Sequence, residues 1–126
     1  MAIQYRLMER IKPNDPTAPK KHYAITQSSG EVSLRQLADQ IGEISTVSSI
    51  DTMAVLESLL KVLPRQLLDG KIIRLGDFGS FRLSLSSSGA DKAEDFTKNM
   101  IKGVNLLFRP GKQITDELNK AEFVKI

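Results

Sequence analysis

The amino-acid sequence predicts an α+β fold, in which helices cover one side of an antiparallel sheet and a β-hairpin precedes them. Residues 33–44 and 49–69 carry apolar side chains at helical spacing. Residues 3–12 and 79–85 instead alternate between apolar and polar side chains, as strands with one buried face do. Of the 126 residues, 40% are hydrophobic and 26% are charged, which is the composition of a globular domain.

We expect a single domain over residues 1–126, since a chain of this length can bury one core. The predicted subdivisions are an N-terminal β extension at 1–31, a core at 32–118 and a C-terminal tail at 119–126.

The first 31 residues predict a β-hairpin. Ile3 to Lys12 alternates in polarity, and Pro13, Pro16 and Pro19 then interrupt the strand. A second strand is expected at 21–27. The basic side chains of this hairpin are Arg6, Arg10, Lys12, Lys20 and Lys21. They form either the solvated face of a structural hairpin or contacts to an anionic partner.

Two helices are expected next. Ser33 and Gln36 have the spacing of a capping box, in which each residue satisfies a backbone N–H at the start of the first helix. The second helix is expected over about 49–69, and Gly70 is suited to end it. Pro64 lies inside this helix and is expected to kink it, because it removes one backbone donor.

The second helix carries more apolar surface than one neighbour can cover. A helix packed on one neighbour needs an apolar stripe about 100° wide, and here apolar side chains occupy well over half of the circumference. These side chains are Ile50, Met53, Ala54, Val55, Leu56, Leu59, Leu60, Val62, Leu63, Leu67 and Leu68. We therefore expect a homodimer, in which a second copy of the chain buries the remaining apolar surface.

The segment Gly70–Leu85 predicts a second hairpin with two different faces. Gly76 and Gly79 flank Asp77 and Phe78 and permit a tight reversal of the chain. One face of the returning strand consists of Phe81, Leu83 and Leu85. The other face consists of Ser80, Arg82, Ser84 and Ser86. Such a sheet is covered on one side and open on the other.

The last forty or so residues predict a mixture of helix and strand. A helix is expected at Ala90–Met100 and a strand at Ile101–Phe108. Pro110-Gly111 then turns the chain into a helix at about 112–120. The tail Glu122–Ile126 is apolar enough to pack back as an edge strand.

Composition restricts the possible chemistry. There is no Cys, and His22 is the only histidine, so the sequence supports neither a metal site nor a catalytic constellation. We expect no enzymatic activity, no cofactor and no small-molecule substrate. No apolar run approaches the ~20 residues that span a membrane, and the N-terminus lacks the apolar core of a signal peptide. The predicted location is therefore cytoplasmic.

Two sequence strings carry a resemblance to a known family. LGDFGSFRL occupies residues 75–83 and FRPGKQITDEL occupies residues 108–118, both in the right order after the two helices. Together they resemble the bacterial HU/IHF family of histone-like DNA-binding proteins. The N-terminal extension resembles that of HU-related proteins from the Bacteroides group. The resemblance implies an intertwined homodimer with a helical base, a β-saddle that faces DNA and two β-arms.

The arm of this chain departs from the family pattern. The family's arm carries a basic RNP-x-TG string, whereas residues 84–103 contain no Pro and no Arg and have zero net charge. Without an apolar wedge the arm lacks the means to unstack base pairs. Without a basic run it releases few counterions from DNA. We therefore expect a shortened arm that contributes little to binding.

Six basic residues remain as candidate DNA contacts. They are Arg74 and Arg82 on the open sheet face, Arg109 and Lys112 at the Pro-Gly turn, and Lys98 and Lys102 in the arm. The other interpretation is that each is a solvated surface charge. The arm lysines, which also include Lys92, lie near the acidic residues Asp91, Glu94 and Asp95. Lys98, four residues after Glu94 and three after Asp95, has the spacing to form an ion pair along the predicted helix.

We predict a homodimeric, nucleoid-associated protein that binds double-stranded DNA weakly and without sequence preference. A net charge of +3 and a pI near 9.3 agree with an anionic partner without requiring one. The alternative hypothesis is an HU-fold dimer that has lost DNA binding and serves as a protein-interaction or structural module.

Overall fold

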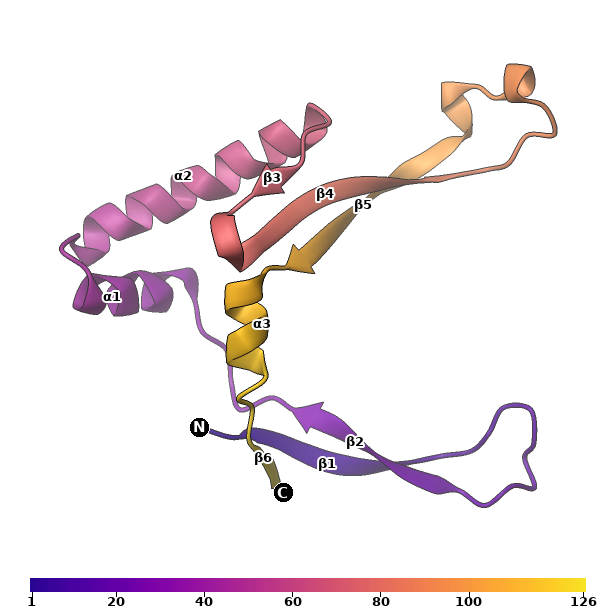
Figure 1. Ribbon diagram of the computed structural model, residues 1–126, viewed down its shortest axis with the longest axis horizontal. Helices are drawn as coiled ribbons and strands as arrows, with labels where there is room; N and C mark the ends of the chain where they lie inside the picture. The colour runs from indigo at the N-terminus through magenta and orange to yellow at the C-terminus, as the bar shows by residue number, and fades with distance from the viewer. The chain divides into compact units, whose positions relative to one another are not determined.

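The computed structural model describes residues 1–126 and contains six strands, three α-helices and three 3₁₀ turns (Figure 1). In chain order they are β1 (Ile3–Arg10), β2 (Lys21–Gln27), α1 (Leu34–Ile44), α2 (Ser49–Leu68), β3 (Ile73–Arg74), η1 (Gly76–Phe78), β4 (Gly79–Ser87), η2 (Ala93–Asp95), η3 (Lys98–Met100), β5 (Ile101–Pro110), α3 (Lys112–Leu118) and β6 (Phe123–Lys125). The predicted α+β class, with helices and small sheets, is confirmed.

The chain forms two compact units. One unit combines Met1–Ser33 with Glu117–Ile126, and the other consists of Leu34–Asp116.

The first unit is built on a three-stranded sheet with the order β2-β1-β6. β1 and β2 form the antiparallel hairpin predicted from the alternation, although β1 ends at Arg10 rather than Lys12. β6 pairs with β1 in parallel, with Ile3 opposite Phe123, which confirms the edge strand expected in the tail. The Ile3 N–H also donates to the Glu122 carbonyl at 2.7 Å, so the two ends of the chain are joined by backbone hydrogen bonds.

The second unit begins with the packed helices α1 and α2. The side chain of Ser48 caps α2, since its Oγ accepts a hydrogen bond of 3.1 Å from the Asp51 N–H. Thr52 is buried, and its hydroxyl donates to the Ser48 carbonyl at 2.8 Å. α2 continues through Pro64, and Gly70 follows it with a φ of 80°, a conformation that favours glycine. No helix in the structure combines the length and the apolar character needed to cross a membrane.

The sheet of the second unit has the order β3-β4-β5, and its strands are antiparallel. Residues that lie opposite one another in this register point to the same face of the sheet. The apolar face therefore combines the pairs Phe81–Phe108, Leu83–Leu106 and Leu85–Val104. The predicted division of the returning strand into one apolar and one polar face is confirmed. The register shows that β5 continues the same two faces.

Two turns meet at one end of this sheet. Phe78 in η1 and Gly111 after β5 are joined by a hydrogen bond of 2.8 Å from the Gly111 N–H to the Phe78 carbonyl. The ring of Phe108 lies 5.7 Å from that of Phe78 and 4.8 Å from that of Phe81. Gly79, with a φ of 151°, leaves no room for a side chain, since a Cβ there would lie 2.7 Å from the Phe108 ring.

The helix predicted at Ala90–Met100 is wrong. The segment contains only two 3₁₀ turns, η2 and η3, at the end of the ribbon that β4 and β5 form. Its apolar residues have helical spacing and would form one stripe along a helix. Such an apolar stripe stabilises a short helix only when it packs against another part of the protein. Here the stripe has little to pack against, and Phe96 stays 40% exposed.

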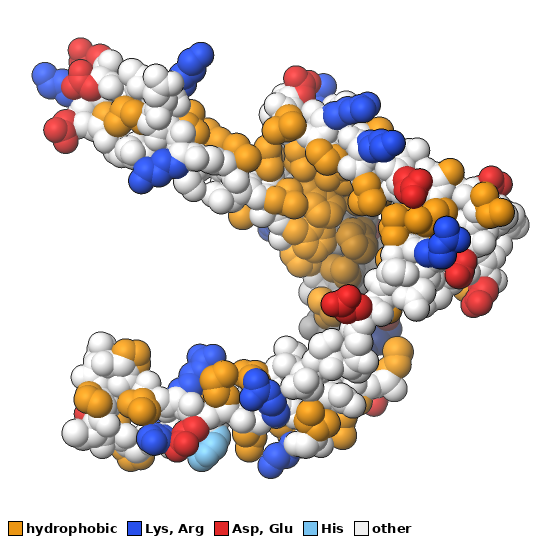
Figure 2. Space-filling view, turned by 180° about the vertical axis from the view of Figure 1, so that it is seen from behind, with side chains coloured by type: hydrophobic (Ala, Val, Ile, Leu, Met, Phe, Trp, Pro, Cys, Tyr) orange, Lys and Arg blue, Asp and Glu red, His pale blue; other side chains and the backbone are white.

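The single chain buries very little apolar surface. Ala38 and Leu67 are its only buried hydrophobic residues. In the second unit, large hydrophobic side chains remain exposed along α2 and the sheet. On α2 they include Ile50, Val55, Leu59, Leu60, Val62 and Leu68. Figure 2 shows a continuous hydrophobic area between the β4–β5 ribbon and the long helix.

Substitution of Gly111 by Ala should lower the free energy of unfolding by about 1–3 kcal/mol, the usual cost of overpacking. The added Cβ would collide with the carbonyl group of Asp77 and separate the two turns. Gly89→Ala is the matched control, since a Cβ there meets nothing within 4 Å. Denaturant unfolding at one fixed protein concentration measures both, and equal losses in the two variants would contradict this explanation.

Candidate functional site

Three arginines lie on the polar face of the β3–β4–β5 sheet. Arg74 of β3 lies opposite Ser80 of β4, and Ser80 lies opposite Arg109 of β5, so these residues form one row across three strands. Arg82 lies two residues beyond Ser80 on β4, which places it on the same face. The register thus brings together three of the six predicted contacts.

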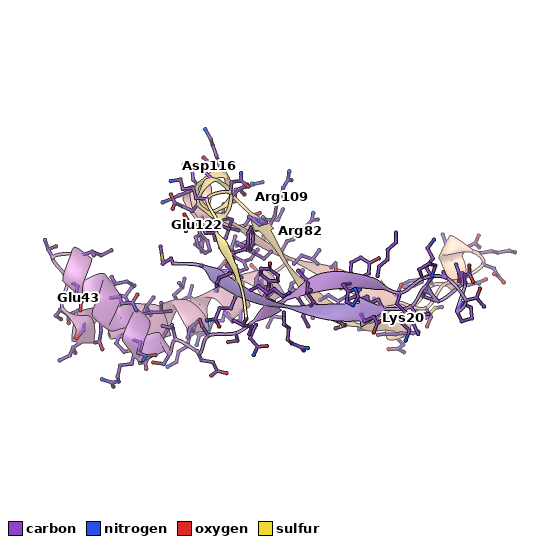
Figure 3. All side chains as sticks on the ribbon, turned by 90° about the horizontal axis from the view of Figure 1, so that it is seen from below. Lys20, Glu43, Arg82, Arg109, Asp116 and Glu122 are labelled. Carbon is purple, nitrogen blue, oxygen red and sulfur yellow. The ribbon has the colours of Figure 1, made fainter.

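The three guanidinium groups border a shallow cavity of about 230 Å³. Its lining residues are Ile72, Arg74, Gly76, Gly79, Ser80, Arg82, Arg109, Pro110 and Gly111. None of them is acidic, and the glycines and Ser80 contribute little side-chain volume to the lining. Figure 3 labels Arg82 and Arg109, which extend from neighbouring strands of this sheet. The cavity is therefore an open cationic hollow rather than an enclosed pocket.

None of these arginines is neutralised within the chain. The two ion pairs of the structure join Lys71 to Asp69 at 3.3 Å and Lys120 to Glu117 at 3.1 Å. Guanidinium groups carry five N–H donors in a planar fork that matches carboxylate and phosphate oxygens. The chemistry of three unpaired guanidinium groups on one face therefore suits anions that carry several oxygens.

The local backbone explains why the arginines are held in place. The Leu75 N–H donates to the Gly79 carbonyl at 2.9 Å, which closes the turn between β3 and β4. The contact between Phe78 and Gly111 fixes the end of β5 against the same turn. Arg74 and Arg109 flank these turns, so the anchor that holds the turns also sets the spacing between the two side chains.

The polar face continues along the ribbon with small side chains. Ser84 lies opposite Asn105, and Ser86 lies opposite Gly103. The Asn105 side-chain amide donates to the Ser86 hydroxyl at 2.9 Å. Sequence reasoning assigned no role to Asn105, although the alternation of β5 places it on the same face as Arg109. Hydroxyl and amide groups of this kind are common contacts to phosphate and sugar.

The three predicted lysines do not join the arginine row. Lys112 is exposed and opens α3 just after Gly111, outside the cavity lining. Lys98 lies in η3, at the far end of the ribbon. Lys102 lies at a β-bulge, because Gly103 pairs with Ser86 and Ile101 pairs with Ser87, which leaves Lys102 without a partner on β4. The strand pairing therefore does not place Lys102 on the arginine face.

The acidic and basic residues at the end of the β4–β5 ribbon form no ion pairs with one another. The ion pairs considered between the arm lysines and Asp91, Glu94 and Asp95 do not form, because the helix that would align them is absent. Figure 2 shows basic and acidic side chains side by side at this end. The ribbon end therefore has no net charge, although its acidic and basic side chains form no ion pairs.

Comparison with known proteins gives one family and a common fold. The family model described as "HU domain fused to wHTH, Ig, or Glycine-rich motif" matches residues 1–125. A candidate DNA-binding protein from Bacteroides vulgatus superposes with a TM-score of 0.68 at 10% identity, covering 99% of this chain and 48% of that protein. The chain thus spans about half the length of that relative.

A second solved structure is HU from Anabaena in a cocrystal with DNA. It superposes with a TM-score of 0.55 at 19% identity, covering 71% of this chain and 99% of the Anabaena protein. Identities this low establish the likeness of fold alone. The comparison with curated proteins gave no match.

Proposed function

The chain belongs to the HU-HIG family, and from that premise we propose that it binds double-stranded DNA through the arginine face of its β3–β4–β5 sheet. The resemblance to HU proteins predicted from the two sequence strings is confirmed by this membership. The observation that carries the proposal is the row of unpaired arginines: Arg74, Arg82 and Arg109 share one face with no carboxylate beside them.

Phosphate is the chemical group that this face fits. DNA presents a regular series of anionic oxygens, and arginine forks bind such oxygens in pairs. Ser80 and Asn105 add neutral donors between and beyond the arginines. Contacts of this type position a protein on the duplex without reading its sequence, so binding is expected to be independent of sequence.

Weak binding follows from the neutral end of the ribbon. Residues 84–103 contain three basic and three acidic residues and no proline, so they supply neither net charge nor a wedge. In this proposal Lys112, Lys98 and Lys102 are peripheral phosphate contacts outside the arginine row. The role that suits weak, sequence-independent binding is association with the bacterial nucleoid.

A homodimer is part of the proposal because the second unit leaves an apolar groove open. The groove has a volume of about 520 Å³ and is lined by Leu59, Leu60, Leu63, Pro64, Leu75, Phe78 and Phe81. Exposed apolar areas of this kind mark protein interfaces. A second copy that inserts its own α2 would cover the groove and double the number of arginines that face DNA.

The alternative function is an HU-fold dimer that acts as an interaction or structural module without binding DNA. The observation that favours it is again the neutral ribbon end. Electrophoretic mobility shift of a duplex at ~50 mM salt separates the two, since phosphate contacts are strongest at low salt. A shift that fades as salt rises is expected, and its absence at low salt would contradict DNA binding.

Arg82→Glu should weaken binding to all duplex sequences alike, because it removes a phosphate contact and adds a repulsive charge. A dimer carries two copies of Arg82, so the substitution removes two phosphate contacts. Each contact contributes about 0.9 to the slope of log K against log salt, so the magnitude of that slope should fall by about 2. Arg35→Glu, on α1, makes the same change of charge away from the sheet and should leave the slope unaltered. A slope that Arg82→Glu does not change would place Arg82 outside the binding surface.

Light scattering at micromolar concentration should give twice the mass of one chain. Leu60→Asp should shift the protein to monomers, because it places a charge in the apolar groove, where Leu60 is 59% exposed in the single chain. Ile44→Asp, at the exposed end of α1, is the matched control. If the wild type is monomeric, or Leu60→Asp stays dimeric, the proposed interface is wrong.

A further inference from the structure

The first unit contains a second two-stranded ribbon, formed by β1 and β2 and the loop at residues 11–20. None of its residues belongs to the arginine face described above. Arg10 lies opposite Lys21 in the register, and Arg6 lies four residues before Arg10 on the same face of β1. Lys12 and Lys20 continue the basic series into the loop, and Figure 3 labels Lys20 just before β2.

The end of this ribbon holds the residue types that the end of the β4–β5 ribbon lacks. Residues 9–22 contain four Lys or Arg and two Asp or Glu, a net charge of +2, together with three prolines. Residues 84–103 have zero net charge and no proline. The basic charge and the prolines are therefore concentrated on the N-terminal ribbon.

A hollow of about 360 Å³ lies at the end of the β1–β2 ribbon, and its lining combines apolar and cationic side chains. Those residues are Arg10, Ile11, Lys12, Pro13, Ala18, Pro19, Lys21 and Tyr23. The Arg10 guanidinium lies over the Tyr23 ring, 5.6 Å from its centroid, which steadies the cation at the rim. No carboxylate is part of the lining, so nothing in the chain neutralises these three cations there.

The two nearby carboxylates are directed elsewhere. Asp15 accepts hydrogen bonds from the Thr17 hydroxyl at 2.6 Å and from the Thr17 N–H at 3.2 Å. The hydrogen bond from the Thr17 side chain is the main reason why the pKa of Asp15 is lowered. Glu9 lies opposite His22 on the other face of the ribbon from Arg10.

We propose that the end of the β1–β2 ribbon is a second contact to duplex DNA, in which Arg10, Lys12 and Lys21 bind phosphates and the apolar floor receives the deoxyribose rings between them. The sugar-phosphate backbone alternates anionic and apolar groups, as the rim and floor of the hollow do. An acidic protein surface would supply negative charge for the cations of the rim. It would not supply regularly spaced sugar rings for the apolar floor, so DNA is the better match. This inference rests on the DNA-binding function proposed above.

The test is a salt titration of duplex binding by the full chain carrying Lys12→Gln and Lys21→Gln. The slope of log K against log salt should fall by about 0.9 for each phosphate contact removed. The control carries Lys120→Gln and Lys125→Gln in the same unit. There Lys120 is paired with Glu117, and Lys125 lies beside Tyr5 on the face opposite Arg10, so the slope should not change.

A second variant tests the apolar floor. Pro13→Ala with Pro19→Ala should weaken binding severalfold at every salt concentration without changing the slope, because no charge is removed. Circular dichroism confirms that each variant keeps its strands.

The outcomes separate this inference from the function on which it rests. If the wild type shifts DNA but the Lys12 and Lys21 variant keeps the wild-type slope, the ribbon contact is overturned and the arginine face stands. An equal fall in the control also overturns it, since overall charge would then explain the loss. If the wild type shifts no DNA at low salt, the proposed function fails, and this inference fails with it.

Discussion

The hydrogen bond from the Gly111 N–H to the Phe78 carbonyl joins the two turns on which the β3–β4–β5 sheet depends. It brings the ring of Phe108 against those of Phe78 and Phe81, which fixes the start of β4 against the end of β5. Glycine is needed at position 111 because a side chain there would collide with Asp77. With the turns held in this way, β4 and β5 keep one register along most of their length.

That register gives the sheet two faces with different partners. Because side chains alternate along a strand, fixing the pair Phe81–Phe108 on one face fixes Ser80 and Arg109 on the other. The apolar face and α2 leave a groove that suits a second copy of the chain. The polar face carries the arginines that suit phosphate. The proposed dimer and the proposed DNA contact therefore have one structural cause.

Charge is distributed unequally between the two ribbons of the chain. The β4–β5 ribbon ends in residues of zero net charge, whereas the β1–β2 ribbon ends in unpaired cations around a hollow that contains prolines. A neutral ribbon gains little from counterion release, and a basic one gains more. In the proposed mode of binding, the N-terminal extension therefore contributes more to DNA affinity than the ribbon that the resemblance to HU proteins identified as the arm.

Local patterns in the sequence determined the helices, the strands and the two glycine turns, because helical spacing and period-two alternation are set by neighbouring residues. The helix predicted at 90–100 failed because a short amphipathic helix is marginal unless its apolar side packs on a neighbour. The sequence also supplied all six candidate contacts. The alternation within the local hairpin already placed Arg74 and Arg82 on one face. Only the tertiary structure decided that Arg109 joins them, since its position depends on the pairing of β4 with β5, where Ser80 and its partner Arg109 lie about thirty residues apart in the sequence.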